Sequence, residues 1–205
     1  MEILFADRDI AVCVKPVGLD SEQSVPQALS ESLPGAFYPV HRLDLNVGGV
    51  MVYARNSAAA AALSQQIVQG SFVKEYVAQV HGIPPEKDDW TDLLFKDSRK
   101  NKVFVVKKER SGVKAARLEF VRLCAGEESQ VRIRLHTGRS HQIRVQFSSR
   151  GFPLVGDHKY GSRSVKTEPL LFSCCLRFTH KGKPVSFEVL PSWLRTDPSD
   201  GEVAL

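Results

Sequence analysis

Residues 40–54 read VHRLDLNVGGVMVYA and join a charged turn to an apolar run. The turn places a single carboxylate, Asp44, after His41 and Arg42 and shortly before the glycine pair 48–49. The run Met51–Ala54 has the apolar and β-branched content of a buried strand. Loops at the ends of such strands often carry reactive side chains. The stretch therefore predicts a core strand with Asp44, a candidate reactive carboxylate, in the turn that leads into it.

Length and composition fit one globular domain. The chain has 205 residues, of which 42% are hydrophobic and 25% charged, enough for a sizeable core. No apolar run approaches the length of a membrane span, and the first residues lack the pattern of a signal peptide. We therefore expect a cytoplasmic protein without a membrane segment. The four cysteines lack C-x-x-C spacing, which favours buried reduced thiols over a metal cluster.

Positive charge is concentrated in one region. The net charge is +5, yet residues 96–122, here called the basic strip, hold ten Lys or Arg residues against three acidic ones. Such a strip favours a polyanionic partner, nucleic acid first. A solvated surface hairpin is an equally good interpretation of the charge alone.

Periodicity predicts three helices and about nine strands. Ser57–Gln69 is the clearest helix, with Ser57 as N-cap and Gly70 as the terminating glycine. A short helix is expected from Pro26 to Ser32, and another from a cap at Ser140 through Arg150. Strands are expected near residues 3–5, 10–14, 51–54, 72–80, 103–106, 115–123, 131–135, 170–178 and 185–190. The pattern predicts a single-domain α+β fold with a mostly antiparallel mixed sheet, helices on one side and a cleft on the other.

Several motifs occur in a recognisable order. Lys15-Pro16-Val17-Gly18 comes first, followed by the tetrad His41–Asp44. Lys74-Glu75-Tyr76 opens a strand that ends at glycine, and residues 135–161 contain His-Gln-Ile-Arg, Gly-x-Pro and Gly-Asp-x-x-Tyr-Gly. Together these motifs resemble the RluA-type pseudouridine synthases over residues 3–194. Enzymes of that family break the glycosidic bond of a uridine in RNA and rejoin the base through carbon.

The resemblance implies three catalytic residues. Asp44 corresponds to the nucleophile, and attack at C6 of the base or at C1′ of the sugar both stay open. Tyr76 corresponds to the aromatic residue that stacks on the flipped uracil, and its hydroxyl can assist removal of the C5 proton. Arg144 corresponds to the ion-pair partner of Asp44, which favours the ionised carboxylate.

Other residues are implied in substrate binding. Arg42 is a candidate to fill the space that a flipped base leaves, His41 lies beside it, and Leu170 or Leu171 packs beside the base. Phosphate contacts are expected from four lysines of the basic strip: Lys100, Lys102, Lys107 and Lys108. Each assignment competes with a structural one, because a loop Asp often closes a turn and a strand Tyr or Leu often belongs to a core.

The family chemistry needs no metal and no organic cofactor, since the isomerisation is redox-neutral. His136 and His141 lie five residues apart, which does not match the spacing of a zinc pair on one helix face. Residues 1–195 are expected to form the catalytic domain and residues 196–205 a polar acidic tail. No S4-like domain precedes the core, so recognition of a structured rRNA or tRNA by a monomeric catalytic domain is expected.

Two places depart from the family pattern. Val47-Gly48-Gly49 stands where Thr-Ser-Gly is frequent, and Phe172-Ser173-Cys174 stands where Leu-His-Ala is usual. These departures leave a second hypothesis open, namely an RNA-binding or RNA-folding factor with impaired catalysis. The intact set of Asp44, Tyr76 and Arg144 favours the enzyme.

Overall fold

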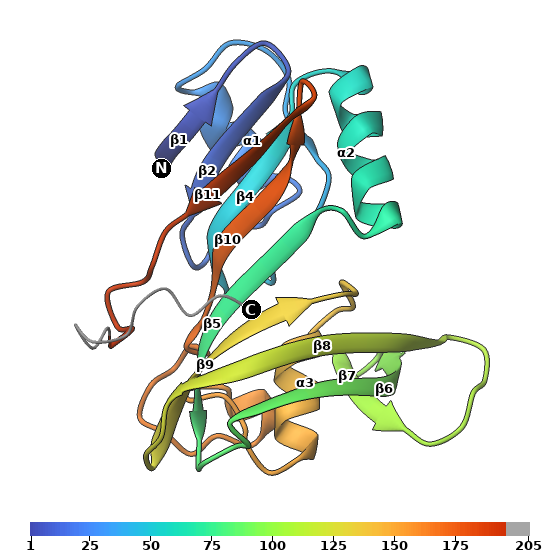
Figure 1. Cartoon of the computed structure of the whole chain (residues 1–205), viewed down its shortest axis with the longest axis vertical. Helices are drawn as coiled ribbons and strands as arrows, with labels where there is room; N and C mark the ends of the chain where they lie inside the picture. The colour runs from blue at the N-terminus through green and yellow to red at the C-terminus, as the bar shows by residue number, and fades with distance from the viewer. Residues whose placement is uncertain (196–205) are drawn as a thin grey trace. The chain divides into compact units, whose positions relative to one another are not determined.

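The computed structural model describes residues 1–195, so the expected tail, residues 196–205, lies outside the described residues. The strands within them are β1 (Glu2–Ala6), β2 (Ile10–Lys15), β3 (Tyr38–Pro39), β4 (Gly48–Ala54), β5 (Val73–His81), β6 (Lys87–Asp97), β7 (Lys102–Val106), β8 (Val113–Cys124), β9 (Glu128–Leu135), β10 (Leu171–His180) and β11 (Lys183–Glu188). The helices are α1 (Ser24–Ser30), α2 (Ser57–Gln69), α3 (Gln142–Ser149) and the 3-10 helix η1 (His158–Tyr160). The predicted α+β class with mostly antiparallel strand pairing is confirmed (Figure 1).

Two compact units make up this domain. The first contains Met1–Glu75 and Phe172–Pro191, and the second contains Tyr76–Leu171 and the segment that starts at Ser192. Strand β5 therefore begins in the first unit and ends in the second.

In the first unit the strand order is β1-β2-β4-β10, with β3 added to β4 and β11 added to β10. All seven residues of β4 are buried. Val52 belongs to the core beneath α2 together with Leu63, whereas the hydroxyl of Tyr53 donates to the carbonyl of Ser21 at 2.8 Å. Neighbouring strand residues face opposite sides of a sheet. Helix α2 therefore covers one face of β4, and the segment leading into α1 covers the other.

Helix α2 has the predicted bounds but a different N-cap. Asn56 has an extended backbone, and its side-chain oxygen accepts a hydrogen bond from the Ala59 N–H at 2.9 Å. The prediction of Ser57 as N-cap was wrong, because the cap is the last non-helical residue and Ser57 is already helical. Gly70 ends the helix in the left-handed conformation, as predicted.

In the second unit the strand order is β9-β8-β6-β7, and the pairs β9–β8, β8–β6 and β6–β7 are antiparallel. Helix α3 packs on this sheet, where Val145 joins a core with Leu94 and Val103. In a second cluster, Trp90 of β6 packs edge-to-face on Phe147 of α3, with ring centroids 4.7 Å apart.

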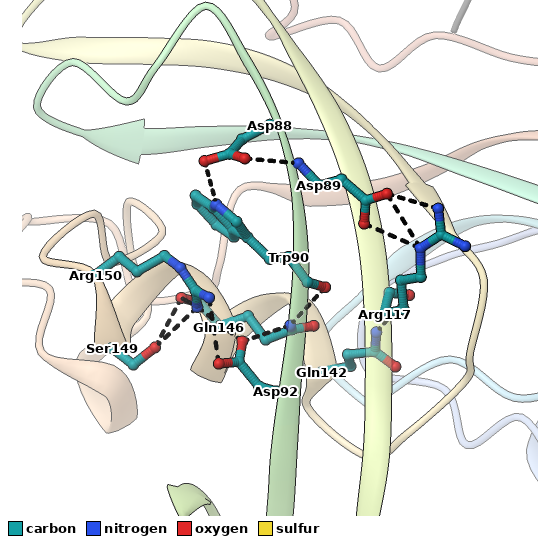
Figure 2. A network of polar contacts seen from close by, with 9 residues as sticks. All are labelled: Asp88, Asp89, Trp90, Asp92, Arg117, Gln142, Gln146, Ser149 and Arg150. Carbon is teal, nitrogen blue, oxygen red and sulfur yellow. Dashed lines mark hydrogen bonds and ion pairs between the residues drawn. The ribbon is translucent and has the colours of Figure 1, made fainter. Parts of the chain in front are cut away.

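A polar network fixes α3 to β6 and β8 (Figure 2). The Arg150 guanidinium donates to both carboxylate oxygens of Asp92, at 2.8 and 3.2 Å, and lies 4.3 Å from the ring centre of Trp90. Gln146 donates to the same carboxylate at 2.7 Å, and Gln142 donates to the carbonyl of Arg117 at 3.1 Å. Two side chains of α3, together with that of Arg150 directly after it, thus hold the helix that carries Arg144 in a fixed register on the sheet.

Candidate active site

The backbone on both sides of Asp44 is clamped by residues of the segment 15–21. The Ser21 hydroxyl donates to the Leu43 carbonyl at 2.9 Å and accepts from the Leu43 N–H at 3.1 Å. The Gly18 N–H donates to the Leu45 carbonyl at 2.8 Å. A turn bond from the Val47 N–H to the Asp44 carbonyl, at 3.0 Å, closes the loop. These bonds hold the loop through backbone groups and the Ser21 hydroxyl, and the Asp44 side chain between them is half-buried.

Lys15 is the centre of this clamp. Its side chain is fully buried, and its ammonium donates to the carbonyls of Leu19 at 2.8 Å, Pro16 at 3.0 Å and Leu45 at 3.3 Å. Burial lowers the pKa of Lys15 to about 8, while the carboxylates of Asp20 and Asp44 oppose that shift. The Lys-Pro-x-Gly motif was visible in the sequence, but this role was not, because three backbone acceptors have no side-chain signature.

The His41 side chain accepts a hydrogen bond from the backbone of β4. Strand β3 pairs with the end of β4, and beyond that pairing the His41 Nε2 accepts from the Val52 N–H at 3.2 Å. Its Nδ1 is buried and has no hydrogen-bond partner among residues 1–195. Burial, followed by the charge of Lys74, lowers the pKa of His41 to about 3. The ring is therefore neutral and fixes the chain just before Arg42, and its expected contact with RNA stays a prediction.

Arg42 points to the surface. Its guanidinium forms one ion pair with Glu22 at 3.2 Å, and both side chains are more than half exposed. An exposed pair of this kind contributes only about 0–1 kcal/mol. Arg42 can therefore leave Glu22 at little cost, as a residue that inserts into RNA would have to.

The two departures from the family pattern meet in the structure. Phe172 and Ser173 of β10 pair in parallel with Gly48 and Gly49 of β4. A Cβ atom on Gly48 would lie 3.4 Å from the Phe172 ring and 3.2 Å from the Lys15 carbonyl. Gly49 has a φ of +130°, and a Cβ there would lie 2.4–2.7 Å from Ser173 atoms. The glycines thus permit close backbone contact at the end of the Asp44 loop.

We expect Gly49→Ala to lower the free energy of unfolding by about 2–6 kcal/mol, because a disfavoured φ and an overpacked contact add up. Gly70→Ala is the matched control, since Gly70 also has a positive φ, +76°, but nothing lies within 4 Å of its added Cβ. The control should lose only about 1–2 kcal/mol. Chemical denaturation of both variants measures the difference, and equal losses would contradict a steric contact at Ser173.

Arg144 of the second unit is held by a residue that sequence reasoning missed. Its Nε donates to Oδ2 of Asp157 at 2.6 Å, and its Nη2 donates to Oδ1 at 2.9 Å. Both side chains are at most 5% exposed. Such a two-bond fork fixes the plane of the guanidinium as well as its position. Asp157 lies in the Gly-Asp-x-x-Tyr-Gly motif, which is the signal that could have indicated it.

Tyr160, from the same motif, lies beside this fork. Its ring centre is 5.1 Å from the Arg144 guanidinium and 5.2 Å from the Lys102 ammonium. Its hydroxyl accepts from the Val103 N–H at 2.9 Å and lies 2.8 Å from His141 Nδ1. Among the four lysines predicted to contact phosphates, Lys102 is thus the one that the structure places against Tyr160.

The other residues predicted to bind the substrate lie partly in the core and partly on the surface. Tyr76 is a buried residue of β5, with 6% of its surface exposed, and Leu171 is equally buried at the start of β10. Leu170 is half-buried, and its backbone bonds to Gln79 and Val155. The other three lysines lie in exposed positions flanking β7: Lys100, Lys107 and Lys108. The roles of all these residues stay predictions.

Groups that could bind a metal ion are few in residues 1–195. Asp7, Asp9 and His180 come close enough together, but the Lys181 ammonium lies 2.7 Å from Asp7 and 3.1 Å from Asp9. A cation of the chain thus already pairs with both carboxylates and offsets part of their charge. The two histidines singled out in the sequence have separate partners, Glu119 for His136 and Tyr160 for His141.

None of the helices in residues 1–195 combines the length and the apolar character needed to cross a lipid bilayer. The four cysteines are free, and Cys13, Cys174 and Cys175 are buried as predicted, whereas Cys124 is only half-buried.

Comparison with known proteins places this arrangement among RNA-modifying enzymes. Residues 9–149 match the family described as RNA pseudouridylate synthase. The dual-specificity RNA pseudouridine synthase RluA of Escherichia coli K12 is 34% identical over 192 residues, which cover 87% of this chain and 86% of that protein. An uncharacterised RNA pseudouridine synthase of Aquifex aeolicus is 33% identical over 233 residues, covering 95% of this chain and 73% of that protein. The structure of human RNA pseudouridylate synthase domain containing 1 aligns with a TM-score of 0.83 at 25% identity, covering 94% of this chain and 84% of that one.

Proposed function

Because the chain belongs to the RNA pseudouridylate synthase family, we propose that it converts uridine to pseudouridine in a structured RNA, an rRNA or a tRNA. The observation that supports this most directly is the buried fork between Arg144 and Asp157, which orients a cation from the family's His-Gln-Ile-Arg motif. We further propose that the protein acts as a monomer in the cytoplasm, without a metal ion or organic cofactor. Size-exclusion chromatography and activity after chelation test these points.

Asp44 is the proposed nucleophile. Its carboxylate adds to C6 of the uracil or to C1′ of the ribose, and the bond between N1 and C1′ breaks. The uracil turns, C5 bonds to C1′, and the bond between the Asp44 carboxylate and the substrate breaks. C5 loses its proton, N1 gains one, and the free carboxylate of Asp44 is regenerated. No atom enters or leaves overall, so the reaction needs neither an oxidant nor a reductant. The clamp of Lys15 and Ser21 supports this role, because it holds the loop without using the Asp44 carboxylate.

Arg144 is the proposed cation that keeps Asp44 ionised. Asp157 supports that role by fixing the guanidinium plane before RNA binds. Arg42 is proposed to occupy the space that the flipped uridine leaves, and His41 to position the backbone for it. Leu170 or Leu171 is proposed to pack beside the base.

Tyr76 is proposed to stack on the flipped base and to assist removal of the C5 proton. If stacking alone matters, Tyr76→Phe should be close to wild type, and Tyr76→Leu should lose about 1–3 kcal/mol of binding. If the hydroxyl takes part, Tyr76→Phe should lose about 10²-fold or more in single-turnover rate. Rates equal to wild type in both variants would show that Tyr76 only packs in the fold.

The four proposed phosphate-binding lysines can be tested through salt dependence. Neutralising Lys100, Lys102, Lys107 and Lys108 to Gln should weaken binding equally for a substrate RNA and for its scrambled sequence. The slope of log affinity against log salt should fall by roughly 0.7 for each lost contact to a single strand. An unchanged slope would mean that these lysines only solvate the surface.

Carbodiimide mapping of pseudouridine tests the function itself. RNA from a strain lacking the gene should lack at least one pseudouridine that wild-type RNA contains, and purified protein should restore it. The altered 47–49 turn is the observation that favours a second candidate function, an RNA-binding or RNA-folding factor. RNA binding without any new pseudouridine would favour that candidate.

A further inference from the structure

A small basic pocket lies in the second unit, apart from the residues assigned so far. It has a volume of about 190 Å³. Its floor is apolar, from Leu94 and Val103, and its rim carries Lys96, Lys114, Arg139 and Ser140. Sites for drug-sized ligands usually have about 300–1,000 Å³. The pocket is therefore suited to a small group.

Strand register explains why the cations converge. Leu94 of β6 pairs with Lys114 of β8, and Lys96 of β6 pairs with Val103 of β7. Paired residues of antiparallel strands share a face. These four side chains therefore project from the face of the sheet on which α3 packs. Arg139 and Ser140 come from the turn that leads into α3, and they close the pocket from the other side.

No carboxylate of residues 1–195 neutralises the positive charge of the pocket. Lys96, Lys114 and Arg139 form no ion pair with any residue in 1–195, and no carboxylate lines the pocket. Other basic residues of the same unit do have partners, for example Arg117 with Asp89 and Arg150 with Asp92. Three cations around one concavity repel one another and attract an anion.

The geometry suits a tetrahedral oxyanion. The Arg139 Nε donates to the Ala115 carbonyl at 2.9 Å, so the terminal nitrogens of its guanidinium remain for a ligand. Ser140 supplies a hydroxyl. The rim residues also precede the N-terminus of α3, whose partial positive charge favours anions. Lys, Arg, Ser and helix N-termini are the groups that proteins use on RNA phosphates.

We propose that this pocket binds one backbone phosphate of the substrate RNA. The proposal rests on the function given above, because it takes RNA as the ligand. The pocket is lined by none of the four lysines assigned above, and Lys102 lies instead against Tyr160, 5.2 Å from the ring centre.

The test uses Lys96→Gln combined with Lys114→Gln. Both side chains are exposed and make no hydrogen bond within residues 1–195, so the variant should fold. Lys87→Gln combined with Lys183→Gln removes the same charge from exposed positions outside the pocket. The RNA probe is a short synthetic stem-loop with uridines in its loop. The pocket variant should lower the salt slope by roughly 0.7–0.9 relative to the control.

Single methylphosphonate substitutions in the same RNA identify the phosphate. One neutralised phosphate should weaken binding by wild-type protein and by the control but leave binding by the pocket variant unchanged. The proposal is overturned if the pocket variant has the same salt slope as the control. It is also overturned if every methylphosphonate that weakens binding by wild-type protein weakens binding by the pocket variant to the same extent. A different outcome is that the pocket variant loses binding while wild-type protein makes no pseudouridine. That result would contradict the proposed activity but support the phosphate site.

Discussion

Asp44→Asn should abolish pseudouridine formation, with a loss of roughly 10⁴-fold or more in single-turnover rate, as expected for removal of a nucleophile. The amide has the shape of the carboxylate but does not attack carbon. The loop should stay in place, because Lys15 and Ser21 hold it through the backbone of Leu43 and Leu45. RNA affinity should therefore stay within a few-fold of wild type.

A double variant, Asp44→Asn combined with Asn46→Asp, tests whether a nearby negative charge is sufficient. It returns a carboxylate to the same loop two residues away, and the sum of charges then equals that of wild type. If a nearby negative charge were enough, the double variant would regain activity. We expect no recovery, because nucleophilic attack requires one fixed position. Turnover near wild type in Asp44→Asn alone would remove Asp44 from the nucleophile role.

Arg144→Ala should inactivate the enzyme and also destabilise it. The substitution leaves the Asp157 carboxylate buried without its partner, a change that usually costs about 3–5 kcal/mol. Loss of activity in this variant is therefore ambiguous on its own. Urea denaturation has to accompany the rate measurement.

Arg144→Lys resolves that ambiguity. An ammonium keeps the charge beside Asp157 but does not reproduce two parallel hydrogen bonds to one carboxylate. We expect most of the stability to return and little of the activity. Asp157→Asn is the matched variant, because it keeps Arg144 and weakens the fork from the other side. Wild-type rates in Arg144→Lys would show that charge alone, without orientation, is sufficient.

The predictions from sequence succeeded where the signal was local. Helix α2 has the predicted bounds because an alanine run and a terminating glycine fix them within one segment. Strand β6 was not predicted, since Asp88, Asp89 and Asp92 mask its alternation. The structure explains these residues: Asp88 accepts from the Trp90 indole at 2.7 Å, and Asp92 binds Arg150. Only the folded chain supplies such partners.

In the candidate site, too, residues with a local sequence signal were predicted, and residues whose role depends on distant contacts were not. Asp44, Tyr76 and Arg144 could be indicated because each lies in a compact motif. Lys15 and Asp157 could not be given roles, although their motifs were noticed. Their partners are a backbone carbonyl at Leu45, thirty residues away, and a guanidinium thirteen residues away. Such contacts depend on tertiary packing, which residue order alone does not reveal.

Gly48 and Phe172 are paired neighbours, so we expect substitutions at these two positions to affect each other. Serine, frequent at the first position in the family pattern, would place its Cβ in van der Waals contact with the Phe172 ring, 3.4 Å away, and in a tighter contact with the Lys15 carbonyl, 3.2 Å away. Leucine, usual at the second, would leave space where the ring now packs on a glycine. Of the two hydroxyls that the 47–49 turn lacks, the one at position 48 is therefore absent where an added side chain would contact both Lys15 and Phe172. Chimeras that graft a relative's loop onto this chain should therefore carry both positions together.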